Sequence, residues 1–202
     1  MIRVREESKE MIEAQKIRMV VFPTIFGILW GLIEMFVGSY LHMIEFPFAG
    51  AVLAGVGAII LCLERSYTPH FRACIYTGIV AVIFKFLSIG VIKVSPAIAI
   101  MIETLIAEAI LTSLGPNPAA YFITCCACSL EGVPHFFISS WVRYGLGIFD
   151  AYRKILEKLG AIFHMGENPL LMFIIIWVGL HLVIGIISGI LVILITGIHR
   201  KK

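Results

Sequence analysis

Six ionisable side chains lie inside long apolar stretches of this chain. They are Glu34, Lys85, Glu103, Glu108, Glu131 and His181. An ionisable group is costly to place in hydrocarbon, so each of these residues is by default a candidate for a functional site. Carboxyls, an amine and an imidazole in such a setting suit ligand contacts, a buried ion pair or a proton path.

The apolar stretches that carry these residues have the length of membrane-spanning helices. Of the 202 residues, 60% are hydrophobic and 14% are charged, and the mean hydropathy is +1.00. A soluble domain is about half apolar and a quarter charged, so a soluble enzyme and a nucleic-acid-binding domain are excluded. Six runs are long enough to cross roughly 30 Å of hydrocarbon as helices. They cover residues 19–43, 46–63, 73–92, 94–114, 119–142 and 169–198.

Two segments outside these runs are predicted to be helices of another kind. Residues 1–18 mix both charge signs and are expected to form a short cytosolic helix ahead of a single transmembrane domain over residues 19–202. Between the fifth and sixth runs, Tyr152, Ile155 and Leu156 alternate with Arg153 and Lys154 at helical spacing. This pattern predicts an amphipathic helix on the membrane surface or over the end of the bundle.

The distribution of Lys and Arg predicts the orientation in the membrane. With six spans both termini share one side, and that side carries ten bases against five on the other. The ten are Arg3, Arg5, Lys9, Lys16, Arg18, Arg65, Arg72, Arg200, Lys201 and Lys202. The bias favours cytoplasmic termini in a multi-pass protein of the cell membrane. The alternative is a re-entrant break of the fifth run at Gly132 and Pro134, which leaves five spans and returns the surface helix to the cytoplasmic side.

Counting residues inward from the outer ends predicts which buried polar groups meet. At 1.5 Å per residue, Lys85 and Glu103 lie at roughly 12 to 14 Å depth on the two helices of one hairpin. Glu34, Glu131 and His181 fall within about one and a half helical turns of that depth. We therefore expect one polar site near the midplane, or at least a buried ion pair between Lys85 and Glu103. The side chain of Glu108 is turned about 140° from that of Glu103 around the helix and faces elsewhere.

The outer ends of the predicted helices add side chains that suit a small organic ligand. His42 and Glu45 lie in the first outer connection, Lys93 in the second, and Trp141 ends the fifth run. These residues, together with Glu34, Lys85, Glu103 and His181, are the predicted binding residues. For Trp141 the alternative is an interfacial aromatic belt, which occupies the same depth.

Small residues on the first run predict close helix packing. Gly27 and Gly31 form a G-x-x-x-G pair, which lets two helices approach closely. The partner helix belongs either to this chain or to another protein, and the sequence favours neither.

Two stretches of the sequence resemble a known family of transport proteins. They are WGLIEMFVGSYLHMIEFPFAGAVLAGVGAIIL from Trp30 and SPAIAIMIETLIAEAIL from Ser95. With the span count and the chain length, they look like the S components of energy-coupling factor transporters, the membrane subunits that capture the substrate. The resemblance implies a six-helix bundle that binds a vitamin or a metal ion near its outer face. It further implies docking, through Gly27 and Gly31, onto a transmembrane coupling subunit powered by two ATPases.

The expected function is therefore capture of a small, vitamin-like molecule for uptake, without a cofactor, a bound metal or a catalytic residue of its own. The metal-transporting branch of the family begins with a His-containing N-terminus, which Met1, Ile2 and Arg3 do not match. The sequence has no Walker A loop, H-E-x-x-H or G-x-S-x-G motif, so the chain itself does not hydrolyse ATP.

Two other functions fit the same residues. One is an intramembrane enzyme that uses Glu103 or Glu131 as acid/base with His181 on a lipid-soluble substrate. The other is an autonomous proton-coupled carrier that uses Glu34, Lys85 and Glu103.

Overall fold

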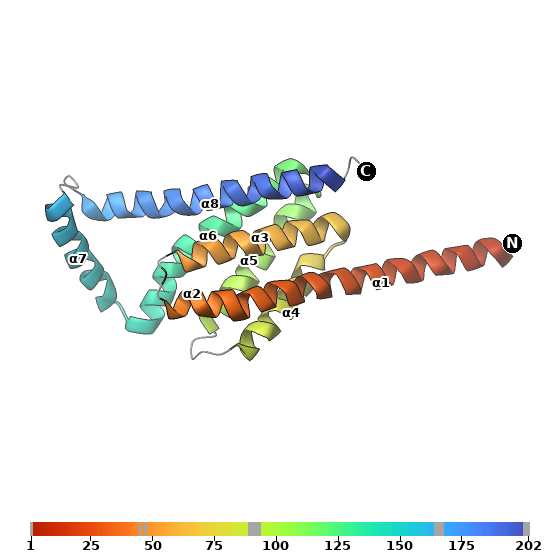
Figure 1. Ribbon diagram of the computed structural model, residues 1–202, viewed down its shortest axis with the longest axis horizontal. Coiled ribbons are helices and arrows are strands. Elements are labelled where there is room, and N and C mark those ends of the chain that lie inside the picture. Colours follow the sequence, from red (N-terminus) through yellow and green to blue (C-terminus); the bar gives the residue numbers. More distant parts are fainter. Residues whose placement is uncertain (1, 45, 47, 89–93, 164–167, 200–202) are drawn as a thin grey trace.

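The protein is a bundle of long helices (Figure 1). The computed structural model describes residues 2–44, 46, 48–88, 94–163 and 168–199. The helices are α1 (Ile2–Ile33), the π-helical turn η1 (Glu34–Gly38), α2 (Ser39–Met43), α3 (Ala49–Tyr67), α4 (Ala73–Leu87), α5 (Val94–Ser113), α6 (Pro118–Tyr144), α7 (Gly147–Phe163) and α8 (Pro169–His199). Each predicted run and the predicted surface helix is helical, so the all-α class is confirmed.

In the described part of the chain, five helices are long and apolar enough to cross a membrane. They cover Ile17–Leu41, Ala49–Tyr67, Val94–Ser113, Pro118–Val142 and Leu170–Gly197. The sixth apolar helix, α4, has 15 residues, or about 22 Å of helix. The end of the third predicted run, residues 89–92, lies outside the described residues.

The fifth predicted span is one continuous helix. Helix α6 runs unbroken through Gly132 and Pro134, so the re-entrant alternative is wrong. The helix begins with a typical N-cap, because the Asn117 side chain accepts a hydrogen bond from the N–H of Ala120. Pro118 opens the first turn, where the N–H that proline lacks would have no partner within the helix. Proline inside a membrane helix is tolerated when neighbouring helices pack around it.

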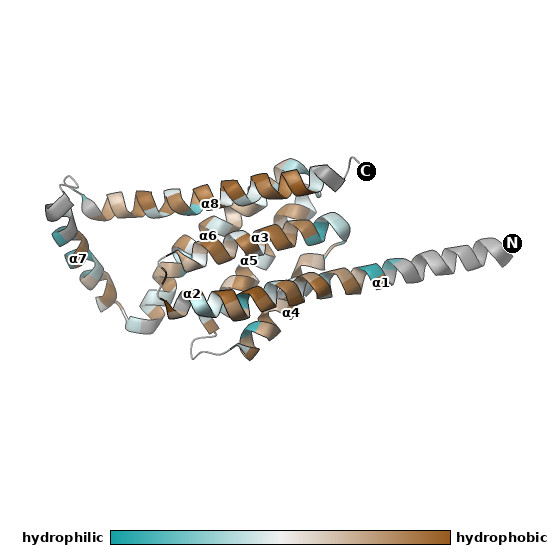
Figure 2. Cartoon of the chain, in the orientation of Figure 1, coloured by the Kyte–Doolittle hydropathy of each residue, from teal (hydrophilic) through white to brown (hydrophobic). Residues whose placement is uncertain are grey.

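The two ends of the bundle differ in what they carry (Figure 1). The start of α1 and the end of α8 lie at the same end, which we call the termini end, and α1 projects beyond the other helices there. Helix α7 lies at the opposite end and links α6 to α8. Figure 2 shows mainly apolar residues along α8 and along the part of α1 inside the bundle. Exposed side chains such as Ile25, Ile175 and Leu194 lie on these helices, as lipid-facing positions require.

The Gly27 and Gly31 face of α1 packs against α4. A Cβ added at Gly27 would lie 2.7 Å from the carbonyl oxygen of Thr77, and one added at Gly31 would lie 2.4 Å from Cβ of Phe84. Helix α4 therefore covers both glycines. The prediction that they form the face for a coupling subunit is wrong, because the close approach that small residues permit is made within this chain.

Candidate functional site

A buried ion pair in the middle of the bundle joins Lys85 to Glu34. Lys85 Nζ lies 2.9 Å from Glu34 Oε2 and donates a second hydrogen bond, at 3.0 Å, to the Glu34 carbonyl oxygen. Both residues are buried. The predicted pair of Lys85 with Glu103 is therefore wrong, although Lys85, Glu34 and Glu103 all lie in the interior as expected.

The ion pair lies at the π-helical turn. A π-turn inserts one extra residue into a helix and rotates the side chains that follow it, and it often marks a functional site. Here the turn begins at Glu34, and its last residue, Gly38, leaves room for the pair: a Cβ at Gly38 would lie 3.0 Å from Glu34 Oε2 and 3.2 Å from Lys85 Nζ. Counting depth measures height along a helix and contains no information on this rotation.

Glu103 is a carboxyl at the centre of the bundle that does not take part in the ion pair of Lys85 and Glu34. It is 6% exposed. Among the residues that the structure describes, none donates a hydrogen bond to its side chain or forms an ion pair with it. A Cβ at Gly57 would lie 2.6 Å from the Trp30 ring and 2.9 Å from Glu103 Oε2, so the indole and the carboxyl meet at this glycine of α3. Glu34 and Glu131 are near enough to act on Glu103 electrostatically.

A second group of polar side chains includes Glu131 and His135 of α6. Oε1 of Glu131 lies 3.4 Å from Nδ1 of His135, whose Nε2 lies 3.0 Å from the hydroxyl of Ser95 on α5. His181 of α8 lies next to these residues, because a Cβ at Gly132 would lie 2.9 Å from its Nε2. Its Nδ1 is 2.9 Å from the Trp177 carbonyl oxygen. His181 thus packs against α6 at Gly132, the residue that follows Glu131 in the sequence.

Aromatic rings lie next to these polar side chains, toward the α7 end of the bundle. Trp177 has its ring centroid 5.1 Å from that of Phe136, 5.4 Å from that of Phe48 and 5.5 Å from that of Phe173. The His181 ring lies 5.4 Å from Trp177 on the side of the carboxyls. The interior therefore changes from acidic at Glu103 and Glu131 to aromatic at Trp177.

Several buried polar atoms of this interior have no hydrogen-bond partner in the described part of the chain. They are Nε1 of Trp30, Nε1 of Trp177 and Oε2 of Glu131. Buried polar groups are nearly always hydrogen-bonded, so each exception needs a reason such as a bound molecule. We call the set Trp30, Glu34, Lys85, Glu103, Glu131, His135, Trp177 and His181 the central polar site. In the described residues it contains no group of three His, Cys, Asp or Glu side chains able to hold a metal ion.

The remaining predicted binding residues are not part of the central polar site as described. Trp141 is half exposed and, with Phe137, Ile138, Leu146 and Phe149, lines an open apolar hollow of about 280 Å³ between α6 and α7. Its role as a binding residue at the outer end of α6 stays a prediction. His42 belongs to α2. Glu45 and Lys93 lie outside the described residues, and so does the side chain of His42.

Trp30, His135 and Trp177 are not among the binding residues predicted from the sequence. Helical spacing was a usable signal, because His135 follows Glu131 by four residues and Trp177 precedes His181 by four. Residues four apart share a helix face. Both were overlooked because His135 lies beside Pro134 and Trp177 resembles an ordinary residue of an apolar helix.

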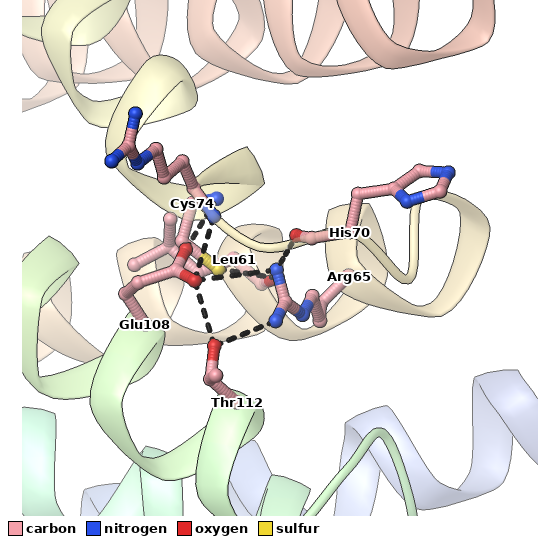
Figure 3. A network of polar contacts seen from close by, with 7 residues as sticks. Leu61, Arg65, His70, Cys74, Glu108 and Thr112 are labelled. Carbon is pink, nitrogen blue, oxygen red and sulfur yellow. Dashed lines mark hydrogen bonds and ion pairs between the residues drawn. The ribbon is translucent and has the colours of Figure 1, made fainter. Parts of the chain in front are cut away.

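A separate polar network lies at the termini end (Figure 3). Arg65 of α3 pairs with Glu108 of α5 at 3.4 Å, and donates hydrogen bonds to the Thr112 hydroxyl at 2.7 Å and to the His70 carbonyl oxygen. Glu108 also accepts the backbone N–H groups of Arg72 and Cys74, at 2.8 and 3.2 Å. These N–H groups open α4, so Glu108 caps that helix from a neighbouring one. The prediction that Glu108 faces away from Glu103 is confirmed.

Comparisons of this chain with protein-family models, curated proteins and solved structures find no match. The central polar site and the sequence resemblance are therefore the observations that bear on its function.

Proposed function

We propose that this protein is a membrane subunit that captures a small organic molecule in the central polar site and passes it across the membrane with the help of partner subunits. The observation that carries the proposal is Glu103, a buried carboxyl without a partner in the described chain. It meets the Trp30 ring, whose N–H is unpartnered in the described chain, at Gly57, and it is near enough to the half-satisfied carboxyl of Glu131 for an electrostatic effect.

The cost of burying these groups supports a ligand. A buried polar atom without a hydrogen bond costs about 1 to 3 kcal/mol, and a charged one costs more. The central polar site has two indole donors and one carboxyl oxygen without partners, in addition to Glu103. A molecule that binds there and contacts several of these groups regains that free energy, and this gives it affinity.

The bundle also supports passage between the two sides of a membrane. With α4 as a sixth span, packed between α1 and α5, the chain crosses an even number of times and both termini lie on one side. The bias of Lys and Arg assigns that side to the cytoplasm. The resemblance assigns a transmembrane coupling subunit and ATPases as partners, which fits a chain without a nucleotide-binding motif.

The alternative of a proton-coupled carrier is favoured by the same carboxyl. A buried Glu without a partner takes up a proton readily, and chains of such residues carry protons in transporters. A carrier moves its substrate alone, whereas a capture subunit needs its partners. Uptake by proteoliposomes that contain only this chain therefore separates the two functions.

The decisive experiment is native mass spectrometry of the protein purified without added ligand. The proposal expects a bound small molecule in the wild type. Trp177→Phe keeps the aromatic ring but removes the indole N–H, so this variant should lose most of the bound molecule. Trp141→Phe is the matched control, since Trp141 lies on the outer hollow, and it should retain the molecule. A wild type without any bound molecule, or equal retention by both variants, would contradict the proposal.

A further inference from the structure

We infer that the molecule bound by the central polar site is an organic cation that also carries a hydrogen-bond acceptor. This inference rests on the proposed function and narrows it to one chemical class. It follows from the charges, the unpartnered donors and the aromatic rings of the site.

The charges of the central polar site do not balance. Three carboxyls, those of Glu34, Glu103 and Glu131, face one amine, that of Lys85. The Lys85 amine donates hydrogen bonds to the carboxylate and to the carbonyl oxygen of Glu34. His135 contacts Glu131 through one ring nitrogen and Ser95 through the other. Glu103 retains no cation among the described residues, so the charge that is missing is positive.

The unpartnered donors show that neither a proton nor an inorganic cation alone satisfies the central polar site. A proton on Glu103 would neutralise the carboxyl but would leave Nε1 of Trp30 and of Trp177 without an acceptor. An inorganic cation would be repelled by these indole N–H groups. It would also find no set of three ligating His, Cys, Asp or Glu side chains in the described chain. One organic molecule with a cationic group and an acceptor satisfies both kinds of orphaned atom.

The aromatic rings supply the third part of the recognition. Trp177 lies within 5.5 Å, between ring centroids, of Phe48, Phe136 and Phe173, and it contacts His181 on the acidic side. The face of an indole attracts a cation electrostatically, and sites for organic ammonium groups combine such rings with carboxylates. An aromatic or quaternary cation therefore fits this interior better than a sugar or an organic acid.

The experiment compares three probes of similar size and different charge: the 4-methoxy derivatives of benzylammonium, benzyl alcohol and benzoate, which are named below by their parent compounds. The methoxy oxygen gives each probe the hydrogen-bond acceptor that the inference requires. Binding to the purified protein in detergent is measured by tryptophan fluorescence and by the shift in melting temperature. We expect benzylammonium alone to bind. Glu103→Gln should weaken its binding by at least about tenfold, the equivalent of one charged hydrogen bond. Glu157→Gln, an exposed change on α7, should leave binding unchanged.

The other outcomes separate this inference from the proposed function. Equal or tighter binding of benzyl alcohol or benzoate, or unchanged binding of benzylammonium to Glu103→Gln, would overturn the cationic class and leave capture of a small molecule standing. If no probe binds, the charge of the molecule that co-purifies with the protein tests the inference instead. A cation would support the inference, and a neutral or anionic molecule would overturn it. Absence of both probe binding and a co-purified molecule would overturn inference and proposed function together.

Discussion

Glu108 and Glu103 lie five residues apart on α5 and are equally buried, yet their surroundings differ completely. Glu108 pairs with Arg65 and accepts hydrogen bonds from the Thr112 hydroxyl and from two backbone N–H groups at the start of α4. Glu103 meets the Trp30 ring at Gly57 and has no donor among the described residues. One carboxyl holds three elements together, and the other is available to a ligand.

The difference shows that burial alone does not distinguish a structural carboxyl from a functional one. The start of α4 presents backbone N–H groups that have no partner within that helix, and Glu108 lies where it can accept them. In the middle of the bundle the helices use most backbone N–H groups for their own hydrogen bonds, and none of the described ones donates to the Glu103 carboxyl. Glu64 also lies at the termini end, but unlike Glu108 it accepts no hydrogen bond from the described residues. It is fully buried beside Arg65, and neither of its carboxyl oxygens makes a hydrogen bond in the described chain.

The largest loss of stability is expected from Arg65→Met. This change removes the one cation that faces Glu64 and Glu108 in the described chain, and breaking a buried pair by removing one partner costs about 3 to 5 kcal/mol. Unfolding followed by circular dichroism in detergent measures the effect. Arg153→Met, on the exposed surface of α7, is the control and should change stability by less than about 0.5 kcal/mol. Equal stability of the two variants would show that the network at the termini end is not structural.

Lys85→Met should lower stability by about 3 kcal/mol, because it leaves the buried Glu34 carboxyl without its partner. Adding Glu34→Leu should recover most of the loss, since the double variant leaves no stranded charge. The informative control is Lys85→Met with Glu103→Leu, which leaves Glu34 stranded and should not recover as much. Recovery with Glu103→Leu but not with Glu34→Leu would show that the pair is the one predicted from depth alone.

Gly31→Ala should cost about 1 to 3 kcal/mol, the usual range for overpacking, because the added Cβ would lie 2.4 Å from Cβ of Phe84. Gly50→Ala is the matched control, since nothing lies within 4 Å of a Cβ there, and alanine stabilises a helix relative to glycine. Thermal melting of both variants tests the α1–α4 packing. If Gly31→Ala melts with the wild type, the glycine face is free for a partner protein after all.

The smallest change in stability is expected from Glu103→Gln. Replacing an unpaired buried carboxyl by a neutral amide of the same shape removes a desolvation cost, so the free energy of unfolding should stay within about 1 kcal/mol of the wild type or rise. The same variant should lose ligand binding. A loss as large as that of Lys85→Met would mean that Glu103 holds a cation in the fold, and the contrast with Glu108 would disappear.

The sequence by itself determined the helices and most of their limits. Apolar runs of 18 or more residues predict helices in a membrane, since only hydrogen bonds within the segment satisfy its backbone there. The predicted run at residues 119–142 corresponds to α6 at Pro118–Tyr144, and the amphipathic pattern around Tyr152 corresponds to α7 at Gly147–Phe163. The six ionisable residues predicted inside these runs include five that are buried in the structure: Glu34, Lys85, Glu103, Glu108 and His181.

Only the tertiary structure decided which of these groups meet. The partner of Lys85 depends on how far each helix is turned about its axis, and Gly38, the last residue of the π-turn, leaves room for the pair with Glu34. The face of α1 that carries Gly27 and Gly31 is turned toward α4 by the packing of side chains from two helices distant in sequence. Hydropathy and depth describe each helix singly, whereas pairing is a property of two helices packed together, so the unpaired state of Glu103 became visible only once the bundle was assembled.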